Sequence, residues 1–489
     1  MGCKMNIRFL LIVVTSAAGC FSAFAADLSV GFARVDITPP LGSYMPGYFI
    51  DRRAKEVLDP LQINCIAFSD GKERALFLQF DTEELSDEVA DAMRDAIVAK
   101  TGVKRDAILL HSSHTHDGGY LAIPKWTPEG CKDPFATDVD YIYVKMTITR
   151  VVDAAVNALA DLKPARLSCG RSVAKRITFG RRYLMKNGKV RTNPGTNNPD
   201  IVRPVGNPPD EEVQVLRIDR DGGKSIAVIN FQTHPDVVGG ETFTADWPGL
   251  ARTIFEAATL GETEAMVVNG TEGDVNHCNV QPRPGEQNGL KTDFDDVERG
   301  YEHARHMANV IVSAVLSVWL KCVPLDSGDI RYGTTTVRVG SNRAKESDEK
   351  NVAWADKVWG LHEAGKDVEL PWRGMELTTE VARARRIRNL REGPDYFDLP
   401  LTSFAIGQSV AFGGFPGEPF NDIGKAVKKR SPFKMTILAC LTNASRGYFP
   451  FSDSFKEDGY EAASSVFGPT VADDLIRGQL DLLNSLLRR

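Results

Sequence analysis

Two histidines separated by one residue, His114 and His116, follow a short apolar run at residues 108–110. A third, His111, lies beside them, although the chain has only eight histidines. Alternate side chains of an extended segment point the same way, so this spacing would direct both imidazoles into one pocket. Neutral imidazole is a common metal ligand and also a general acid or base. The pattern predicts a metal or acid–base site just past the end of a strand.

Polar groups also follow several later strand-like runs. The groups of interest after those runs are His234, Glu418 and Tyr448. In α/β sheets, sites form in the crevice beyond the carboxyl ends of strands, so converging ends would place these groups with His114 and His116. Imidazole and carboxylate donors suit Zn²⁺, and a catalytic zinc keeps one position open for water. Each residue alone has an ordinary alternative: a structural histidine, a first-turn helix carboxylate or a core tyrosine.

The elements that would position these groups alternate between strands and helices. Two hairpins are predicted, from residues 65–68 with 75–80 and from 213–218 with 226–231. Apolar periodicity predicts helices near 84–100, 138–161, 295–320 and 471–487, and further strands at 266–268, 404–412 and 435–441. No internal repeat stands out. We expect an α/β fold with mixed sheets flanked by helices, in one large domain over residues 27–489, with a charged helical insertion at about 341–392.

The N-terminus has the features of a cleaved secretory signal. Lys4 and Arg8 precede an apolar run, and an Ala-x-Ala site ends at Ala25. We therefore expect residues 1–25 to be removed and the protein to be secreted or periplasmic. The alternative is a lipoprotein attached through Cys20. The six remaining cysteines show no CxxC spacing, and no disulfide pairing is assigned.

Composition limits the classes of partner. The 489-residue chain has a net charge of -6 with acidic and basic residues interspersed, which argues against a nucleic-acid surface. It specifies no oligomeric state and leaves room for peripheral membrane contact.

The motifs together resemble neutral, non-lysosomal ceramidase-like proteins. The resemblance covers roughly residues 28–470. It rests on the N-terminal segments 30–40 and 45–48. It also rests on residues 113–116, 234–235, 273–275 and 417–419, and on Tyr448 and Tyr460. Such proteins have an α/β zinc-hydrolase domain that hydrolyses an N-acyl amide. The resemblance implies a small-molecule or lipid-like N-acyl substrate and one zinc ion per chain.

The resemblance also implies roles for individual residues. His114, His234, Glu418 and Tyr448 would ligate zinc. His116 would act beside the metal as an acid–base group or oxyanion donor. An arginine near the reacting centre would be Arg181, with Arg182 an equal candidate, and Tyr460 would be a second tyrosine pointing at the site.

Two departures from the ceramidase pattern stand out. Ceramidases carry a serine after Gly-Asp-Val, where this chain has Asn276. A mechanism that needs a serine nucleophile there cannot operate, whereas a zinc–water mechanism can, with Asn276 as a hydrogen-bond donor. Ceramidases also continue into a C-terminal β-sandwich domain, and this sequence ends about 30 residues after Tyr460 in a predicted helix. We expect the catalytic domain alone, acting on an amide or related ester bond.

Two other functions remain open. A two-metal amidohydrolase barrel also uses His-x-His at a strand end, but it needs further histidines on later strands. A secreted binding protein could keep the fold without the chemistry, and Asn276 is the best support for it.

Overall fold

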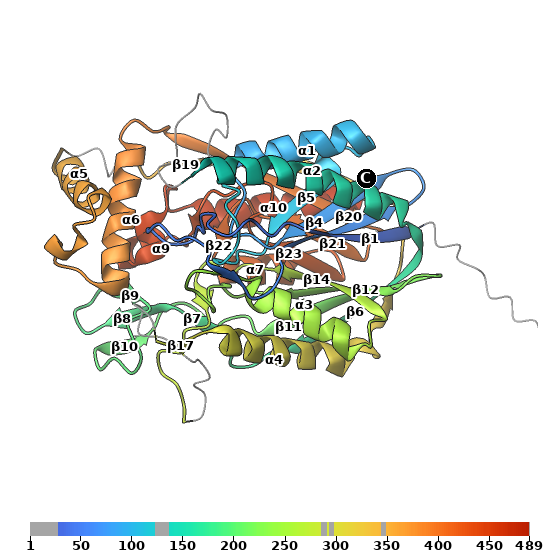
Figure 1. Ribbon diagram of the computed structural model, residues 1–489, viewed down its shortest axis with the longest axis horizontal. Coiled ribbons are helices and arrows are strands. Elements are labelled where there is room, and N and C mark those ends of the chain that lie inside the picture. The colour runs from blue at the N-terminus through green and yellow to red at the C-terminus, as the bar shows by residue number, and fades with distance from the viewer. Residues whose placement is uncertain (1–27, 123–135, 285–290, 293–297, 344–348, 489) are drawn as a thin grey trace, which may run out of the picture.

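Three successive stretches of the chain fold into the same order of elements. Leaving aside short strands and a helical insertion between them, each unit has three antiparallel strands, then a helix, then a fourth strand parallel to the third, and finally a longer helix. The computed structural model describes residues 28–122, 136–284, 291–292, 298–343 and 349–488, and the helices and strands of all three units lie within these ranges (Figure 1). A parallel pair needs a crossover connection, which the helix between the last two strands supplies.

The first unit shows why these residues form these elements. It consists of β1 (Ser29–Asp36), β3 (Gln62–Ser69), β4 (Arg74–Phe80), α1 (Asp87–Thr101), β5 (Ile108–Ser112) and α2 (Asp138–Ala160). The β3–β4 hairpin turns at Asp70, whose carboxylate accepts the N–H groups of Lys72 and Glu73 at 2.8 and 2.7 Å. Helix α1 begins after Ser86, whose hydroxyl accepts a first-turn N–H, and it ends at Gly102 in the left-handed conformation.

The other two units repeat this order and pairing. The second consists of β6 (Lys163–Val173), β11 (Glu212–Arg220), β12 (Ser225–Phe231), α3 (Asp246–Ala258), β14 (Thr263–Asn269) and α4 (Tyr301–Trp319). The third consists of β19 (Ile330–Gly340), β20 (Tyr396–Ile406), β21 (Val410–Gly414), α7 (Asn421–Arg430), β23 (Met435–Ala439) and α10 (Val471–Arg488). The sequence showed no repeat, so the repetition is one of topology.

The first two units share one sheet, and the third has its own. The larger sheet has the order β14-β12-β11-β6-β1-β3-β4-β5, with β18 (Val323–Leu325) also paired to β6. The third unit's order is β19-β20-β21-β23. The chain after β23 bonds to both outer strands of the larger sheet. Cys440 N–H donates to the Asn269 carbonyl at 3.1 Å, and Ser112 N–H donates to the Leu441 carbonyl at 3.2 Å. The carboxyl ends of β5, β14 and β23 therefore meet.

Separate helix pairs cover the two sides of the molecule. Helices α1 and α2 lie along one side, and α3 and α4 lie along the opposite side (Figure 1). The largest apolar cluster joins the first unit to the third, and it includes Phe404 and Phe412, whose rings stack 4.5 Å apart. A second cluster packs α3 and α4 against the strands of the second unit, around the fully buried Trp247. Burial of apolar surface contributes roughly 25 cal/mol per Å², so these clusters stabilise the packing of the sheets and hold the strand ends in place.

The predicted α/β fold of mixed sheets flanked by helices is confirmed, and so are both hairpins and the long helices. Two details of the prediction are wrong. Residues 404–412 do not form one strand, because Gly407 (φ 54°) turns the chain between β20 and β21. The helix expected from residue 295 begins only at Tyr301, after Gly300 with a φ of 132°.

The segment 341–392, expected to be a helical insertion, contains α5 (Glu349–Glu363) and α6 (Gly374–Leu390). Both helices lie at one end of the molecule, near the short helix α9 (Tyr460–Ser464) (Figure 1). A small apolar cluster packs α5 against α6. Arg386 of α6 donates to the Ala462 carbonyl at 2.9 Å, so α6 is docked on α9.

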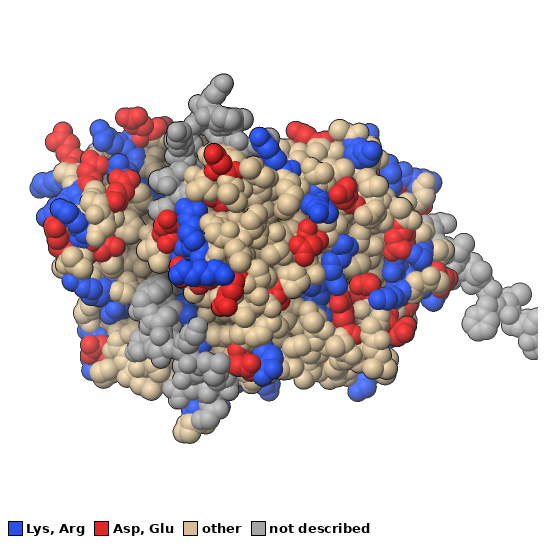
Figure 2. All heavy atoms as spheres, in the orientation of Figure 1, with Lys and Arg blue, Asp and Glu red and all other residues tan. Residues whose placement is uncertain are grey.

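The surface carries charges of both signs. On the face drawn in Figure 2, basic and acidic side chains are interspersed. None of the described helices is both long and apolar enough to cross a membrane. Among the described residues, Cys65, Cys169, Cys322 and Cys440 are free cysteines. The predicted signal at 1–25, with Cys20, and Cys131 lie outside the described residues.

Candidate metal centre

Four buried side chains from the three units meet where their strands end. His114 follows β5, His234 follows β12, Glu272 follows β14, and Glu418 lies in β22 (Glu418–Pro419) after β21. One nitrogen or oxygen from each lies within 4.8 Å of the others. We call these four residues the metal group. Two imidazoles and two carboxylates form a donor set that suits zinc or a similar divalent ion.

The imidazoles of His114 and His234 are oriented as metal ligands usually are. Nδ1 of His114 lies 3.1 Å from the Glu83 carbonyl oxygen, and Nδ1 of His234 lies 2.9 Å from the Glu272 carbonyl oxygen. Each Nδ1 thus faces an acceptor, which for His234 includes the Glu272 carboxylate at 2.5 Å, and both Nε2 atoms are left facing Glu418. Oε2 of Glu418 lies 3.4 Å from Nε2 of His114 and 3.2 Å from Nε2 of His234. Hydrogen bonding of the second ring nitrogen is how proteins orient metal-binding histidines.

His114 reaches this position by a route that the sequence did not predict. We expected His114 and His116 to alternate along an extended segment, but His114 has a φ of 74°, in the left-handed region. Its N–H donates to the Thr82 carbonyl at 3.0 Å, which pins this turn after β5. The two imidazoles still meet, with their Nε2 atoms 3.4 Å apart. The spacing argument was therefore wrong, although its conclusion holds.

A two-residue strand pair brings Glu418 and Tyr448 together. β22 runs parallel to β24 (Tyr448–Phe449), and Glu418 is the register partner of Tyr448. The Tyr448 hydroxyl lies 3.4 Å from Nε2 of His234, and the two rings are stacked 6.4 Å apart. Glu418 is not a first-turn helix carboxylate, because α7 begins only at Asn421 and the Glu418 side chain faces the imidazoles.

Glu272 belongs to the metal group but was missed in the sequence. Its Oε2 lies 2.5 Å from Nδ1 of His234, on the side of the ring that faces away from Glu418. A carboxylate in that place orients a metal-binding histidine and raises its basicity. The position after β14 was a usable signal, since polar groups followed each of the other strands. In the sequence Glu272 lies between Gly270 and Gly273, and nothing local shows which way its carboxylate points.

The electrostatics of the metal group call for positive charge. Burial alone would lower the pKa of His114, but the charges of Glu418 and Glu272 outweigh burial and raise it to about 10. The pKa of His234 is also raised, because Glu272 outweighs burial. In turn, the two imidazoles hold the pKa of Glu418 well below its usual value, against the effect of burial. A divalent cation could meet this demand by taking the place of the protons on the imidazoles.

His116 lies beside the metal group in a tight cage. Its buried Nδ1 makes no hydrogen bond among the described residues, and the nearest carboxylate oxygen, Oδ1 of Asp236, is 3.9 Å away. Burial lowers the pKa of His116 well below its usual value, so the ring is neutral. Gly47, with a φ of 108°, passes directly over the ring: a Cβ there would lie 2.5 Å from Nδ1. Arg299 pairs with Asp236 at 2.6 Å, which fixes the carboxylate under the ring.

Of the two candidate arginines, the structure brings Arg181 to the site and turns Arg182 away. Arg181 Nη1 lies 3.3 Å from Nε2 of His234, and its guanidinium lies 5.3 Å from the centroid of the Tyr448 ring. Its Nε donates to Glu461 at 2.7 Å, which holds the side chain in place. Arg182 instead donates to Ser454 at 2.9 Å.

Tyr460 also reaches the site. It is the first residue of α9, and its ring meets the Tyr448 ring edge-on at 5.6 Å. The Arg181 guanidinium lies 6.0 Å from the Tyr460 centroid. The described site is thus a buried metal group with His116 on one side and Arg181, Tyr448 and Tyr460 on another.

The fold matches solved structures, although no family model and no curated protein matches the sequence. The neutral ceramidase from Pseudomonas aeruginosa superposes with a TM-score of 0.67, over 94% of this chain and 75% of that chain, at 16% sequence identity. A ceramidase complexed with C2 superposes with a TM-score of 0.66, at the same identity and coverage. The chain has the neutral ceramidase fold.

The ceramidase fold rules out one alternative. Within the described residues, the strands form a nine-stranded and a four-stranded sheet with mainly antiparallel pairs, plus small two- and three-stranded sheets. A two-metal amidohydrolase barrel needs a closed parallel barrel. That interpretation of His114 and His116 is therefore wrong.

Asn276, where ceramidases carry serine, lies in β15 (Val275–Asn276) beside the site. Its amide nitrogen donates to Asn193 at 3.2 Å, and its amide oxygen accepts the Cys278 N–H at 3.0 Å. These bonds fix the loop whose Val275 carbonyl accepts the His234 N–H at 3.2 Å. Asn276 thus supports the loop that holds His234, and its role as a direct hydrogen-bond donor to substrate stays a prediction.

Proposed function

We propose that this protein is a zinc-dependent hydrolase of N-acyl amide bonds, acting on ceramide-like lipids. One observation carries the proposal: on a ceramidase fold, the three units bring two imidazoles and two carboxylates into one buried group with an arginine and two tyrosines beside it. A binding scaffold would have no need for this combination. The low sequence identity leaves the substrate open to amides other than ceramide and to related esters.

The residues of the metal group fit a single ion. His114, His234 and Glu418 would hold it, with Tyr448 as a fourth ligand and Glu272 orienting His234. Zinc in such a site supplies a Lewis acid and makes water nucleophilic near neutral pH. The protein supplies the geometry, since the ligands come from strand ends fixed by the two sheets.

The remaining side chains handle protons and charge. In amide hydrolysis a water oxygen bonds to the carbonyl carbon, the C–N bond breaks, and the leaving nitrogen takes up a proton. Nε2 of His116 lies 3.4 Å from Nε2 of His114, so His116 could accept the proton from water and pass it to the nitrogen. Arg181 and Tyr460 lie on the other side, where they can stabilise negative charge on the carbonyl oxygen.

The experiment that tests this proposal is elemental analysis of the purified protein, followed by hydrolysis assays. We expect about one zinc per chain and release of fatty acid from an N-acyl sphingosine. Two metals per chain would contradict the mononuclear centre. A metallated protein inactive on amides, esters and lactones would favour the binding-protein alternative.

We also propose that the protein is exported, with residues 1–25 as a cleaved signal and lipoprotein attachment at Cys20 as the alternative. The support is the N-terminal pattern of basic residues, an apolar run and an Ala-x-Ala site. N-terminal sequencing of the mature protein would distinguish cleavage after Ala25 from modification at Cys20.

Tyr448→Phe is expected to lower kcat by roughly 100-fold or more, as the loss of a single transition-state donor does elsewhere. The unfolding free energy should change by only about 1 kcal/mol, because the substitution removes one hydroxyl and keeps the aromatic ring. The measurement compares kcat with thermal unfolding. Tyr143→Phe, which removes a buried hydroxyl within α2, is the control. Unchanged kcat in Tyr448→Phe would remove this hydroxyl from the mechanism.

A further inference from the structure

The loop at residues 46–51 passes over His116, and we call it the cover loop. Gly47 lies against the imidazole, and the centroid of the Tyr48 ring is 5.6 Å from the centroid of the His116 ring. Among the described residues, none of the backbone N–H groups of the cover loop donates to a backbone carbonyl. The conformation of the loop therefore depends on the contacts of its side chains.

Two side chains tie the first half of the cover loop to the metal centre. Arg52, which is buried, donates to the Pro46 carbonyl at 2.5 Å and also to the His116 carbonyl. The Tyr48 hydroxyl donates to the Asp236 carboxylate. The second half of the loop has no part in these bonds and needs a contact of its own.

Phe49, the next residue, packs against the helical insertion. Its ring meets the imidazole of His362 in α5 edge-on, with 6.4 Å between the centroids. The half-buried Phe49 side chain also packs on the apolar cluster between α5 and α6. His362 is held by Asp367, whose carboxylate oxygens lie 3.0 and 3.1 Å from Nδ1. Aromatic side chains bury a large apolar area, so this contact restrains the cover loop.

The insertion can hold Phe49 because it is itself anchored beside the metal centre. Arg386 of α6 donates to the Ala462 carbonyl of α9, and Arg383 of α6 donates to Asp458 at 2.6 Å. Helix α9 begins at Tyr460, whose ring faces the metal centre. Helix α6 is thus fixed to a segment that belongs to the site.

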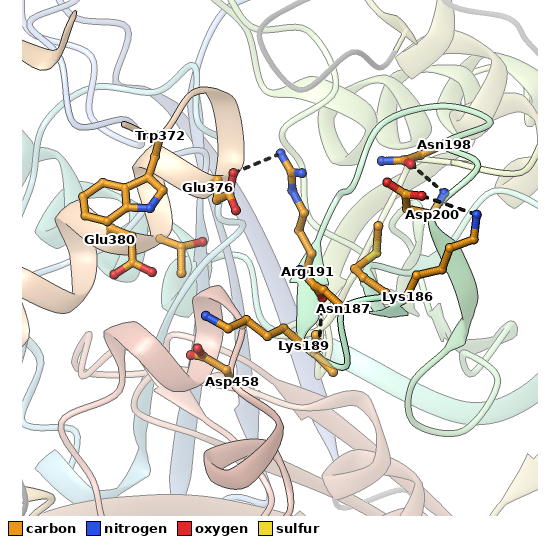
Figure 3. Close-up of a pocket in the computed structure, with 14 residues that line it drawn as sticks. Lys186, Asn187, Lys189, Arg191, Asn198, Asp200, Trp372, Glu376, Glu380 and Asp458 are labelled. Atoms are coloured by element: carbon orange, nitrogen blue, oxygen red, sulfur yellow. Dashed lines mark hydrogen bonds and ion pairs between the residues drawn. The ribbon is translucent and has the colours of Figure 1, made fainter. Parts of the chain in front are cut away.

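The flank of α6 that faces β9 (Val190–Thr192) is less tightly packed. A polar cavity of about 380 Å³ lies there, and Arg191 of β9 reaches Glu376 of α6 only at 4.0 Å (Figure 3). Trp372, just before α6, lines the same cavity and meets Trp354 of α5 edge-on at 6.2 Å. Because an open cavity makes few van der Waals contacts, the contacts with α9 rather than this flank anchor α6.

We propose that Phe49 is a positioning residue for His116. By docking on the helical insertion, Phe49 holds Gly47 and Tyr48 against the imidazole. The proposal rests on the proposed amide hydrolysis, in which His116 transfers the proton. It adds the helical insertion to the parts of the fold that the reaction needs, since α5 and α6 then support the cover loop as well as α9.

The first experiment measures kcat, KM and metal content for the metal-loaded Phe49→Ala protein. Displacement of a catalytic group by about 1 Å can cost roughly 100-fold in rate, and the loop keeps its other ties, so we expect kcat to fall about tenfold. KM and metal content should stay near those of the unmodified protein, because loss of positioning in the transition state lowers kcat and kcat/KM equally.

Two variants accompany this one. Phe49→Leu keeps an apolar side chain for the cluster and should restore most of kcat. Ile50→Ala is the matched control, because Ile50 belongs to the same loop but is 56% exposed, and it should keep its kcat. If Phe49→Ala does not fold, His362→Ala, which removes only the partner ring, takes its place with the same expectations.

The second experiment follows the position of His116 without any substrate. Diethyl pyrocarbonate modifies accessible imidazoles, and peptide mass spectrometry gives the rate for His116 alone. Because His116 is only 8% exposed, it should react slowly in the unmodified protein and in Ile50→Ala. In Phe49→Ala the rate should rise about tenfold or more, because loss of a packed aromatic side chain lets the cover loop open.

The two experiments distinguish failure of this proposal from failure of the proposed function. If the unmodified protein hydrolyses no amide, the proposed function fails, and the labelling rate alone decides whether Phe49 positions His116. If Phe49→Ala lowers only the melting temperature, with kcat and labelling unchanged, Phe49 is merely structural and the proposal is overturned. Faster labelling with an unchanged kcat would overturn it as well, because the reaction would then not need the cover loop.

Discussion

Replacing His114 with alanine is expected to remove the metal and the hydrolytic activity together. The Nε2 atom of His114 lies 3.4 Å from Glu418 and faces the centre of the metal group. Loss of an outer-shell partner of a metal ligand usually costs 10–100-fold in affinity, so loss of a ligand itself should cost more than about 100-fold. Metal content after dialysis and amide hydrolysis are the two measurements. A His114→Ala protein that keeps its full metal content would refute the assignment.

The matched control for this prediction is His306→Ala. His306 lies in α4, outside the metal group, and is half-buried. Its loss should change neither metal content nor turnover. The comparison also controls for stability, since His114 is buried and its replacement leaves His234 as the one imidazole of the metal group beside Glu418. Binding of added zinc by the folded His114→Ala protein, measured by titration, separates weakened affinity from unfolding.

Gly47→Ala is expected to inactivate the enzyme while leaving the metal in place. The added Cβ would lie 2.5 Å from Nδ1 and 2.8 Å from Cγ of His116, far inside van der Waals contact. The imidazole must therefore shift, and displacement of a catalytic group by about 1 Å can cost roughly 100-fold in rate. None of the metal group touches Gly47 in this way, so the metal content should stay near that of the unmodified protein.

Gly42→Ala separates the clash from the backbone cost. Gly42 also has a positive φ, 88°, but a Cβ there would meet nothing within 4 Å. Both substitutions therefore carry a left-handed penalty of about 1–2 kcal/mol, and only Gly47→Ala strikes the imidazole. We expect Gly42→Ala to lower the melting temperature slightly and to keep its kcat. Equal activity in both variants would show that the position of His116 does not matter to the reaction.

The sequence predicted the centre better than it predicted the path of the chain. Strand ends followed by His234, Glu418 and Tyr448 could be recognised, because apolar runs of strand length and their turn residues are local signals. The left-handed turn at His114 could not, because it is imposed by a hydrogen bond to Thr82 from another loop. Glu272 was missed for a similar reason: only the fold shows that its carboxylate faces His234.

Contacts between residues far apart in the sequence also explain the remaining differences between the predictions and the structure. Arg181 and Arg182 were equal candidates because they are adjacent in the sequence, and only the folded structure shows that Arg181 contacts His234 while Arg182 contacts Ser454. The fold class followed from alternating helices and strands, as expected. The repetition of three units could not be predicted from the sequence, because units can share an order of strand pairing without sharing residues.

That repetition has a consequence for how the protein is assembled. The first unit contributes His114, the second His234 and Glu272, and the third Glu418, so no unit owns a complete centre. An ion bound by all of them would link the third unit to the sheet of the first two, in addition to the apolar cluster that already joins them. A ligand present at 1,000 times its Kd stabilises the native state by about 4 kcal/mol. For an ion bound here, this free energy would favour the docked arrangement of the three units. Catalytic competence would then be the last property the chain acquires during folding, after its most distant segments have docked.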